Sequence, residues 1–143
     1  MASRNISDLS PVMQDYYYKM LRAIREDPFL QLMNISVLLT CTYRSGEEQM
    51  RLYAQGRTTP GAIITRAKAG QSKHNVVNDK GQPAAEAFDV VPLRDGKPVW
   101  GTKGDDLKVW NKVGEHGMGV GLKWYGAPGS VFKEMAHFQN PSV

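Results

Sequence analysis

Apolar residues recur at helical spacing near the start of the chain. Ser10 and Pro11 form a good N-cap and first-turn pair, and the apolar positions after them are Val12, Met13, Tyr16, Tyr17, Met20, Leu21 and Ile24. The pattern predicts an amphipathic helix that ends near Asp27-Pro28, with its tyrosines and methionines facing a core. The β-branched, apolar run 36–43 then predicts an interior strand.

A second helix is predicted directly after that strand. Ser45 and Glu48 make a capping box, which places Arg44 at a junction between strand and helix. The stretch 57–73 predicts a long loop with a short strand at 62–65. Loops of this length are uncommon in compact domains and are often functional.

The second half of the chain alternates between strand and helix patterns. A strand at 87–93, a turn and a partner strand at 98–100 predict a hairpin. Residues 105–116 predict a third helix that stops at Gly117, where a string of alternating glycines indicates a turn, and short apolar runs follow. Helices mixed with antiparallel strands in this order predict an α+β fold.

Composition is typical of one soluble domain. The 143 residues are 41% hydrophobic and 22% charged, and a chain of this length can bury about two thirds of its unfolded surface. No apolar run approaches the ~18–20 residues that cross a bilayer, and the N-terminus lacks the layout of a signal peptide. We therefore expect a single domain over residues 1–143, made in a cytoplasm and not inserted in a membrane.

The single cysteine and the charge distribution narrow the function further. Cys41 lies in an apolar run, which predicts a buried, unreactive thiol. The net charge of +4 comes from residues 1–74, which carry ten basic and six acidic side chains, and a basic stretch lies between Glu48 and Asp79: Arg51, Arg57, Arg66, Lys68 and Lys73. This stretch is either a solvated surface or a patch for an anionic partner. Nucleic acid is disfavoured as that partner, because no recognised motif accompanies the charge.

Histidines and carboxylates carry the strongest chemical signal. A catalytic zinc commonly has three N or O protein ligands and one open position. The candidates are His74, Asp89, and the Glu134–His137 pair in "KEMAHFQ", whereas His116 ends a helix, where its charge favours the dipole. Each residue taken singly has a structural explanation, so spacing alone leaves a zinc site open.

Four sequence blocks occur in order over residues 38–139: "TYRSGEEQMRLYAQGRT", "AKAGQSKHN", "AFDVVPL" and "W…VGEHGMGVGLKW…FKEMAHFQ". Together they resemble the zinc peptidases of the D-Ala-D-Ala carboxypeptidase family. Within that family the chain is most similar to phage endolysins that cleave the L-alanyl-D-glutamate bond of peptidoglycan stem peptides. The resemblance implies a compact α+β fold with a small antiparallel sheet, shared with the hedgehog signalling domain.

The resemblance also implies the site residues, through the family pattern S-x-H, A-x-D and [D/E]-x-x-H. It implies one zinc ion with three ligands, His74, Asp89 and His137. It implies two catalytic residues, Glu134 as general base and Arg44 to polarise the scissile carbonyl. It assigns substrate binding to Ser72, Gln49 and Trp124.

One departure from the family concerns the link between the first two ligands. The family's link is usually six residues, whereas residues 75–88 make fourteen here. A longer surface loop costs little, since doubling a loop costs about 0.6 kcal/mol of closure entropy. Asp79 or Glu86 could in principle substitute for Asp89, which is preferred because its strand would fix its direction.

The resemblance predicts a monomeric phage lysin that hydrolyses the L-Ala-D-Glu bond and has no separate cell-wall-binding domain. It would stay in the host cytoplasm until a holin-type protein opens the membrane, and would then reach the periplasm and the cell wall. The alternatives are a D-Ala-D-Ala carboxypeptidase or dipeptidase and a non-catalytic, hedgehog-like zinc-binding domain. The presence of both Arg44 and Glu134 speaks against the last of these.

Overall fold

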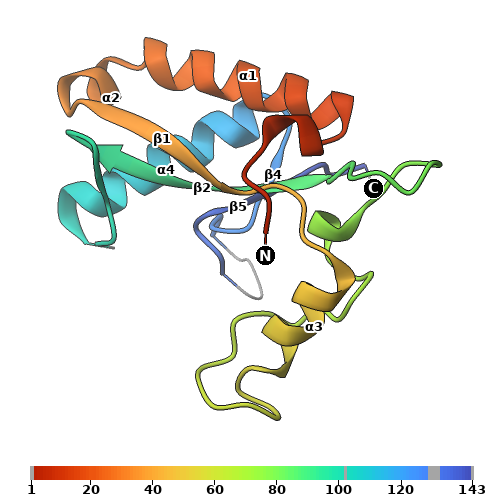
Figure 1. Ribbon diagram of the computed structural model, residues 1–143. Coiled ribbons are helices and arrows are strands. Elements are labelled where there is room, and N and C mark those ends of the chain that lie inside the picture. Colours follow the sequence, from red (N-terminus) through yellow and green to blue (C-terminus); the bar gives the residue numbers. More distant parts are fainter. Residues whose placement is uncertain (1, 102, 129–132, 143) are drawn as a thin grey trace.

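Five antiparallel strands form the sheet at the centre of the computed structural model, which describes residues 2–101, 103–128 and 133–142 (Figure 1). The order across the sheet is β1 (Ile35–Cys41), β2 (Ala87–Arg94), β5 (His137–Gln139) and β4 (Lys123–Trp124), and β3 (Lys97–Pro98) pairs with β2. The long central strand β2 therefore touches β1, β3 and β5. This architecture confirms the predicted α+β class.

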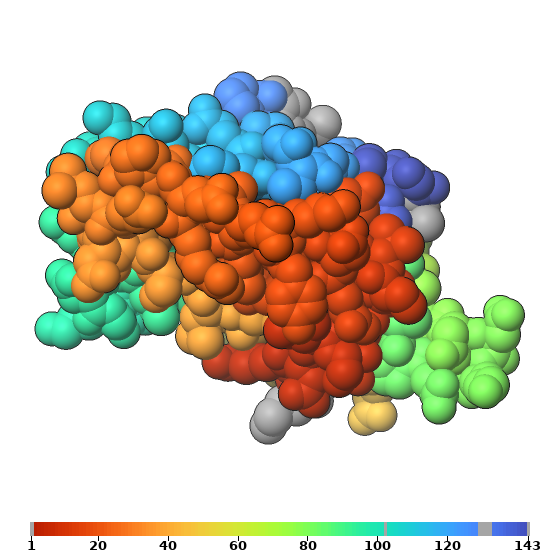
Figure 2. Space-filling view, turned by 90° about the horizontal axis from the view of Figure 1, so that it is seen from above, coloured from red at the N-terminus to blue at the C-terminus, as the bar shows by residue number. Residues whose placement is uncertain are grey.

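Four α-helices surround the sheet in the described ranges: α1 (Pro11–Glu26), α2 (Pro28–Leu32), α3 (Gly46–Ala54) and α4 (Gly104–Gly119). The long helices α1 and α4 lie against each other on one side of the sheet (Figures 1 and 2). Helix α3 and the loop after it lie on the other side, away from that layer. None of the described helices is both long enough and apolar enough to span a bilayer.

Helix boundaries follow the capping signals. Ser10 accepts a hydrogen bond from the Met13 amide (3.2 Å), and Ser45 accepts one from the Glu48 amide (3.1 Å), which confirms both predicted caps. The chain forms the unpredicted helix α2 because Asp27 caps it and Pro28 occupies its first position. The strand predicted at 62–65 is absent, and β3 is shorter than the predicted strand 98–100.

The main core lies between the sheet and the α1–α4 layer. Phe88 and Val90 of β2 are fully buried there, and the Phe88 ring stacks on Phe138 of β5 at a centroid distance of 5.6 Å. Successive residues of a strand face opposite sides. Asp89 lies between two core residues and therefore faces away from the α1–α4 layer. His137, which precedes Phe138, faces the same way.

The predicted helix stop at Gly117 is wrong, because α4 continues to Gly119. A Cβ on Gly117 would overlap the ring of Phe138, and a Cβ on Gly114 would overlap the indole of Trp124. Gly114 and Gly117 therefore let the helix approach the sheet closely. The turn predicted from the alternating glycines lies just beyond the helix, at residues 120–121, where Gly121 has a φ of 111°. At the end of the same helix, His116 Nε2 lies 2.6 Å from Asp27 Oδ2, which ties α4 to the start of α2.

Candidate metal centre and active site

Three residues from adjacent strands form a row on the sheet face opposite the helices. Asp89 of β2 is paired with Cys41 of β1 on one side and with His137 of β5 on the other. The register between β1 and β2 shifts by one residue between Leu39 and Cys41, so Thr40 forms a β-bulge. Without the bulge, Cys41 would face the core.

A fourth potential ligand, His74, comes from a short 3-10 turn, Lys73–Asn75. Ser72 caps this turn, because its Oγ accepts a hydrogen bond from the His74 amide (3.2 Å). The Arg44 amide donates to the His74 carbonyl (2.9 Å), and Asn75 Nδ2 donates to the Arg44 carbonyl (2.8 Å). These bonds fasten the turn to the end of β1 and hold the buried His74 ring over the row.

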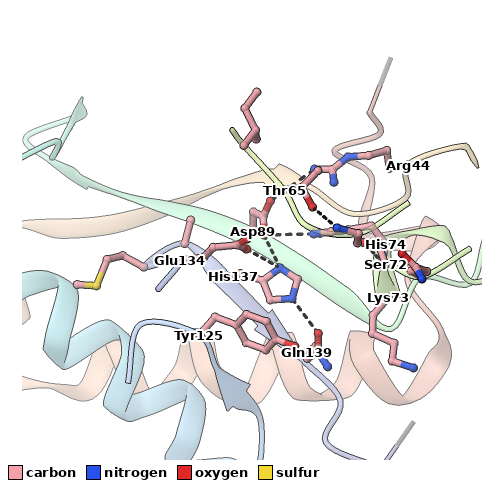
Figure 3. Close-up of a pocket in the computed structure, with 15 residues that line it drawn as sticks. Arg44, Thr65, Ser72, Lys73, His74, Asp89, Tyr125, Glu134, His137 and Gln139 are labelled. Atoms are coloured by element: carbon pink, nitrogen blue, oxygen red, sulfur yellow. Dashed lines mark hydrogen bonds and ion pairs between the residues drawn. The ribbon is translucent and has the colours of Figure 1, made fainter. Parts of the chain in front are cut away.

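Both histidine rings direct a nitrogen at the same carboxylate oxygen (Figure 3). His74 Nε2 lies 3.2 Å and His137 Nδ1 lies 3.1 Å from Asp89 Oδ1. The remote nitrogens face oxygen acceptors: His74 Nδ1 donates to the Thr42 carbonyl (2.8 Å), and His137 Nε2 donates to Gln139 Oε1 (3.0 Å). In a neutral ring the remote nitrogen therefore carries the proton, and the near nitrogen presents its lone pair to Asp89.

This donor set fits a divalent metal ion. Two nitrogen lone pairs and a carboxylate that face one another repel unless positive charge lies among them, and metal-binding histidines usually donate the remote N–H to an oxygen. Two imidazoles and one carboxylate suit zinc. Ligand atoms of Cys41, His74 and Asp89 also lie within 4.8 Å of one another, which makes Cys41 an alternative third ligand to His137.

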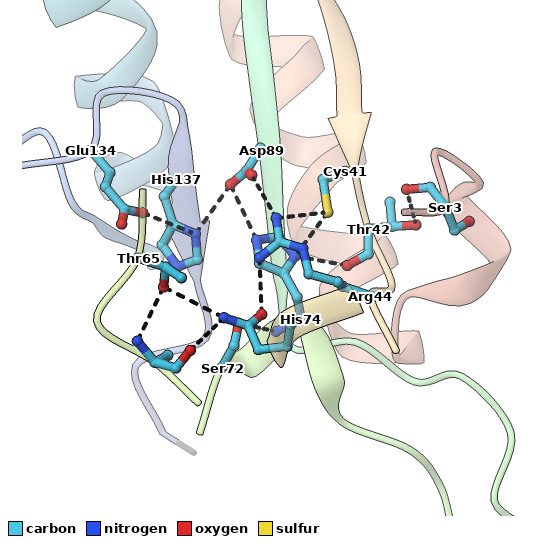
Figure 4. A network of polar contacts seen from close by, with 12 residues as sticks. Ser3, Cys41, Thr42, Arg44, Thr65, Ser72, His74, Asp89, Glu134 and His137 are labelled. Atoms are coloured by element: carbon cyan, nitrogen blue, oxygen red, sulfur yellow. Dashed lines mark hydrogen bonds and ion pairs between the residues drawn. The ribbon is translucent and has the colours of Figure 1, made fainter. Parts of the chain in front are cut away.

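Cys41 is buried, as predicted, but its surroundings are not those of an inert core residue. Its Sγ lies 3.5 Å from His74 Nδ1 and 3.6 Å from Arg44 Nη2 (Figure 4). No local pattern of residue types indicates these contacts, because they depend on the bulge at Thr40.

The electrostatics of the cluster favour positive charge beside Asp89. Burial raises the pKa of Asp89, but His74 and His137 outweigh it and hold the pKa well below its usual value. Burial lowers the pKa of His74, yet the adjacent Asp89 raises it to about 10. These shifts favour an ionised Asp89 with positive charge on His74, and a bound cation would take the place of that positive charge.

Arg44 and Glu134 lie on the wall of the same pocket, which encloses about 330 Å³. Arg44 Nη2 lies 3.9 Å from Asp89 Oδ2, and Glu134 Oε2 lies 3.9 Å from His137 Nδ1. Burial raises the pKa of Glu134, and the charge of Asp89 adds to this, whereas His137 acts in the opposite direction. A carboxyl group with a raised pKa beside potential metal ligands suits a general base.

A curated sequence relative decides the family. Over 110 residues, 73% of this chain, the sequence is 33% identical to the peptidoglycan L-alanyl-D-glutamate endopeptidase CwlK of Bacillus subtilis (strain 168). The chain belongs to the same family as CwlK. This relationship confirms the family that the four sequence blocks indicated, while the phage origin stays a prediction. The matched region spans 60% of the length of CwlK.

A solved structure shares the fold. The chain resembles the L-Ala D-Glu endopeptidase ChiX of Serratia marcescens with a TM-score of 0.53, over 98% of this chain and 88% of ChiX. The sequence identity is 16%, so this likeness shows the fold alone. No protein-family model matches the chain.

The pocket of this chain, a relative of CwlK, brings together six of the eight predicted site residues: Arg44, Ser72, His74, Asp89, Glu134 and His137. Gln49 and Trp124 do not line it, and both are buried, 0% and 3% exposed. Trp124 is paired with Phe138 and faces the core, so the alternation of β4 leaves the next residue, Tyr125, on the pocket side.

The long link between His74 and Asp89 forms a loop whose two ends lie side by side. Its tip is exposed and stands out from the body of the molecule as the green projection in Figure 2, and the exposed Asp79 lies there. At its end, the Glu86 amide donates to the Lys73 carbonyl (2.9 Å). The Glu86 carboxylate accepts a hydrogen bond from Asn140 (3.1 Å), so neither alternative carboxylate meets the histidines.

Sequence reasoning missed three residues of the site besides Cys41. The Tyr125 ring packs on the His137 ring at a centroid distance of 4.5 Å, while Thr42 and Gln139 hold the remote histidine nitrogens. The position of Gln139 was open to prediction, because it lies two residues after His137 in a strand pattern and so shares its face. Thr42 acts through its backbone carbonyl, which no residue type reveals.

Proposed function

We propose that this chain is a zinc peptidase that hydrolyses the L-Ala-D-Glu bond of peptidoglycan stem peptides. The observation that supports it is the convergence of His74 and His137 on one oxygen of Asp89, with Arg44 and Glu134 on the wall of the same pocket. The activity named for its relative CwlK supports the choice of bond.

In this proposal zinc is held by Asp89 and by the two histidine nitrogens that face it, His74 Nε2 and His137 Nδ1. Bound zinc supplies a Lewis acid that lowers the pKa of water to about 7 and so provides a nucleophile at neutral pH. Cys41 suits the third position less well than His137. Its Sγ lies beside His74 Nδ1, the nitrogen already engaged by the Thr42 carbonyl.

Glu134 and Arg44 would handle the proton and the developing negative charge. Glu134 would accept the proton of the attacking water and return it to the leaving amine, as base and then acid. The positive guanidinium of Arg44 would stabilise the oxygen of the scissile carbonyl as it becomes negative, a contribution of a few kcal/mol. Its buried Nε has no hydrogen-bond partner in the described part of the chain.

Digestion of purified peptidoglycan, followed by mass spectrometry of the products, tests the reaction. Cleavage of the L-Ala-D-Glu bond releases stem peptides that begin with D-Glu, whereas a D-Ala-D-Ala carboxypeptidase releases alanine. We expect the former products, their loss with a chelator, and their return with added zinc. Products that are unaffected by chelation would contradict the metal mechanism.

Replacement of Glu134 separates an enzyme from a hedgehog-like zinc-binding domain. We expect Glu134→Gln to lower kcat by about 10²–10⁴-fold, the usual contribution of a positioned base, while the protein keeps its bound zinc. The control is Glu115→Gln on the exposed side of α4. Metal analysis and kcat are measured on the same samples, and unchanged kcat in Glu134→Gln would eliminate the assigned base.

The lysis role is proposed separately from the chemistry. In a Gram-negative host, cytoplasmic expression of the chain alone should leave the culture intact, and co-expression of a holin-type protein should cause lysis. Glu134→Gln in the same pair of cultures serves as the control. Lysis without the second protein would show that the chain reaches the wall by another route.

A further inference from the structure

Gln49 lies directly behind the pocket and joins two parts of its wall. The residue is in the second turn of α3, and its side chain is completely buried. Its Oε1 accepts a hydrogen bond from Arg44 Nη1 (3.0 Å). Its Nε2 donates to the Ala67 carbonyl (2.7 Å) and lies 3.5 Å from Thr65 Oγ1. Arg44, Thr65 and Ala67 all line the pocket.

These partners fix the orientation of the Gln49 amide. A guanidinium can only donate, so it selects the amide oxygen, and a backbone carbonyl can only accept, so it selects the amide nitrogen. Arg44 has weaker contacts elsewhere, 3.6 Å to Cys41 Sγ and 3.9 Å to Asp89 Oδ2. Among the described residues, Gln49 therefore gives the guanidinium its shortest side-chain hydrogen bond.

We propose that Gln49 is a positioning residue that acts through Arg44. It aims the guanidinium into the pocket and links that direction to the docked position of the wall segment that contains Thr65 and Ala67. This inference rests on the proposed function, in which Arg44 stabilises the transition state. It replaces the substrate-binding role predicted for Gln49, since a side chain with no exposed surface does not touch substrate.

A double-mutant cycle between Gln49 and Arg44 tests the proposal. We expect Gln49→Leu to lower kcat by about 10–100-fold with a smaller change in KM, because misplaced catalytic groups cost rate on that scale. In an Arg44→Ala background the same substitution should change kcat little, since its effect passes through Arg44. An equal loss in both backgrounds would overturn the proposal and leave Gln49 with a structural role only.

Gln55→Leu is the matched control. Gln55 also holds the loop that follows α3, through a hydrogen bond from its Nε2 to the Ala62 carbonyl (2.9 Å). The hydrogen bond from Arg44, in contrast, goes to Gln49, nearer the start of the helix. We expect kcat close to that of the unsubstituted protein. A loss equal to that of Gln49→Leu would mean that loop anchoring alone is responsible. If Gln49→Leu does not fold, Gln49→Met, of similar length, takes its place.

NMR of the Arg44 guanidinium provides a readout that needs no activity. The signal is assigned by its absence in Arg44→Lys. Loss of the Gln49 acceptor should speed rotation of the guanidinium about its Nε–Cζ bond, and an unchanged rotation rate would contradict the positioning role. If the unsubstituted protein released no peptide from peptidoglycan, the proposed function would fail, while this measurement would still test the contact.

Discussion

The two histidines of the cluster owe their orientation to neighbours that are not themselves in the donor set. His74 is held by the Thr42 carbonyl, and Thr42 is held in turn by Ser3, whose carbonyl accepts from the Thr42 amide (2.7 Å) (Figure 4). His137 is held by Gln139 on the same strand. Each proton is thus placed by a residue outside the donor set, as is usual for metal-binding histidines.

Separate replacement of His137 and Cys41 decides which residue is the third ligand. We expect His137→Ala to weaken zinc binding by more than about a hundredfold, because loss of an outer partner alone costs about 10–100-fold. Cys41→Ala should retain zinc, since its sulfur lies at the engaged nitrogen of His74. Competition with a chelating dye measures both affinities. Loss of zinc in Cys41→Ala with retention in His137→Ala would assign the site to Cys41, His74 and Asp89.

At the level of elements, the alternation of side chains along β2 and β5 explains which residues face the pocket. The glycines of α4 explain how closely that helix packs against the opposite face of the sheet. Asp89 and His137 face the pocket because Phe88, Val90 and Phe138 face the core. Helix α4 packs on the back of β5 without an intervening side chain at Gly117. A strand only three residues long therefore has a rigid backing where it carries His137.

A pair of glycine substitutions in α4 tests this packing. Gly117→Ala should destabilise the fold by about 1–3 kcal/mol, because the added methyl overlaps the Phe138 ring and overpacking costs that much. Gly119 has open space around it, so Gly119→Ala should stabilise the fold by about 0.4–1 kcal/mol through the unfolded chain. Urea unfolding measures both. A destabilisation shared by the two variants would indicate a helix effect unrelated to Phe138.

For the molecule as a whole, the sequence predicted what depends on local pattern and missed what depends on pairing across strands. The caps at Ser10 and Ser45 and the strand through Asp89 follow from spacing within a few residues. The position of Cys41 depends on a one-residue register shift against β2, and the burial of Gln49 depends on a loop that docks on α3. Neither leaves a mark on the local pattern of residue types.

Part of the basic stretch lies beside the pocket. Arg66 and Lys68 are exposed, and their chain neighbours Thr65 and Ala67 line the pocket wall. Stem peptides are rich in carboxylates, so positive charge there should speed their approach. Reversal of both charges should lower kcat/KM at low salt by about tenfold or more and flatten its dependence on ionic strength.

The matched control for this reversal lies on α1, across the sheet from the pocket. Arg22→Glu with Arg25→Glu takes the net charge from +4 to zero, as does Arg66→Glu with Lys68→Glu, but on exposed positions of the helix layer. If the local patch steers the substrate, kcat/KM at low salt should fall only in Arg66→Glu with Lys68→Glu. At high salt, where charges about 10 Å apart are screened, the kcat/KM values of the two variants should converge. Equal losses in the two variants would assign the effect to net charge, and no loss in either would make the stretch a solvated surface.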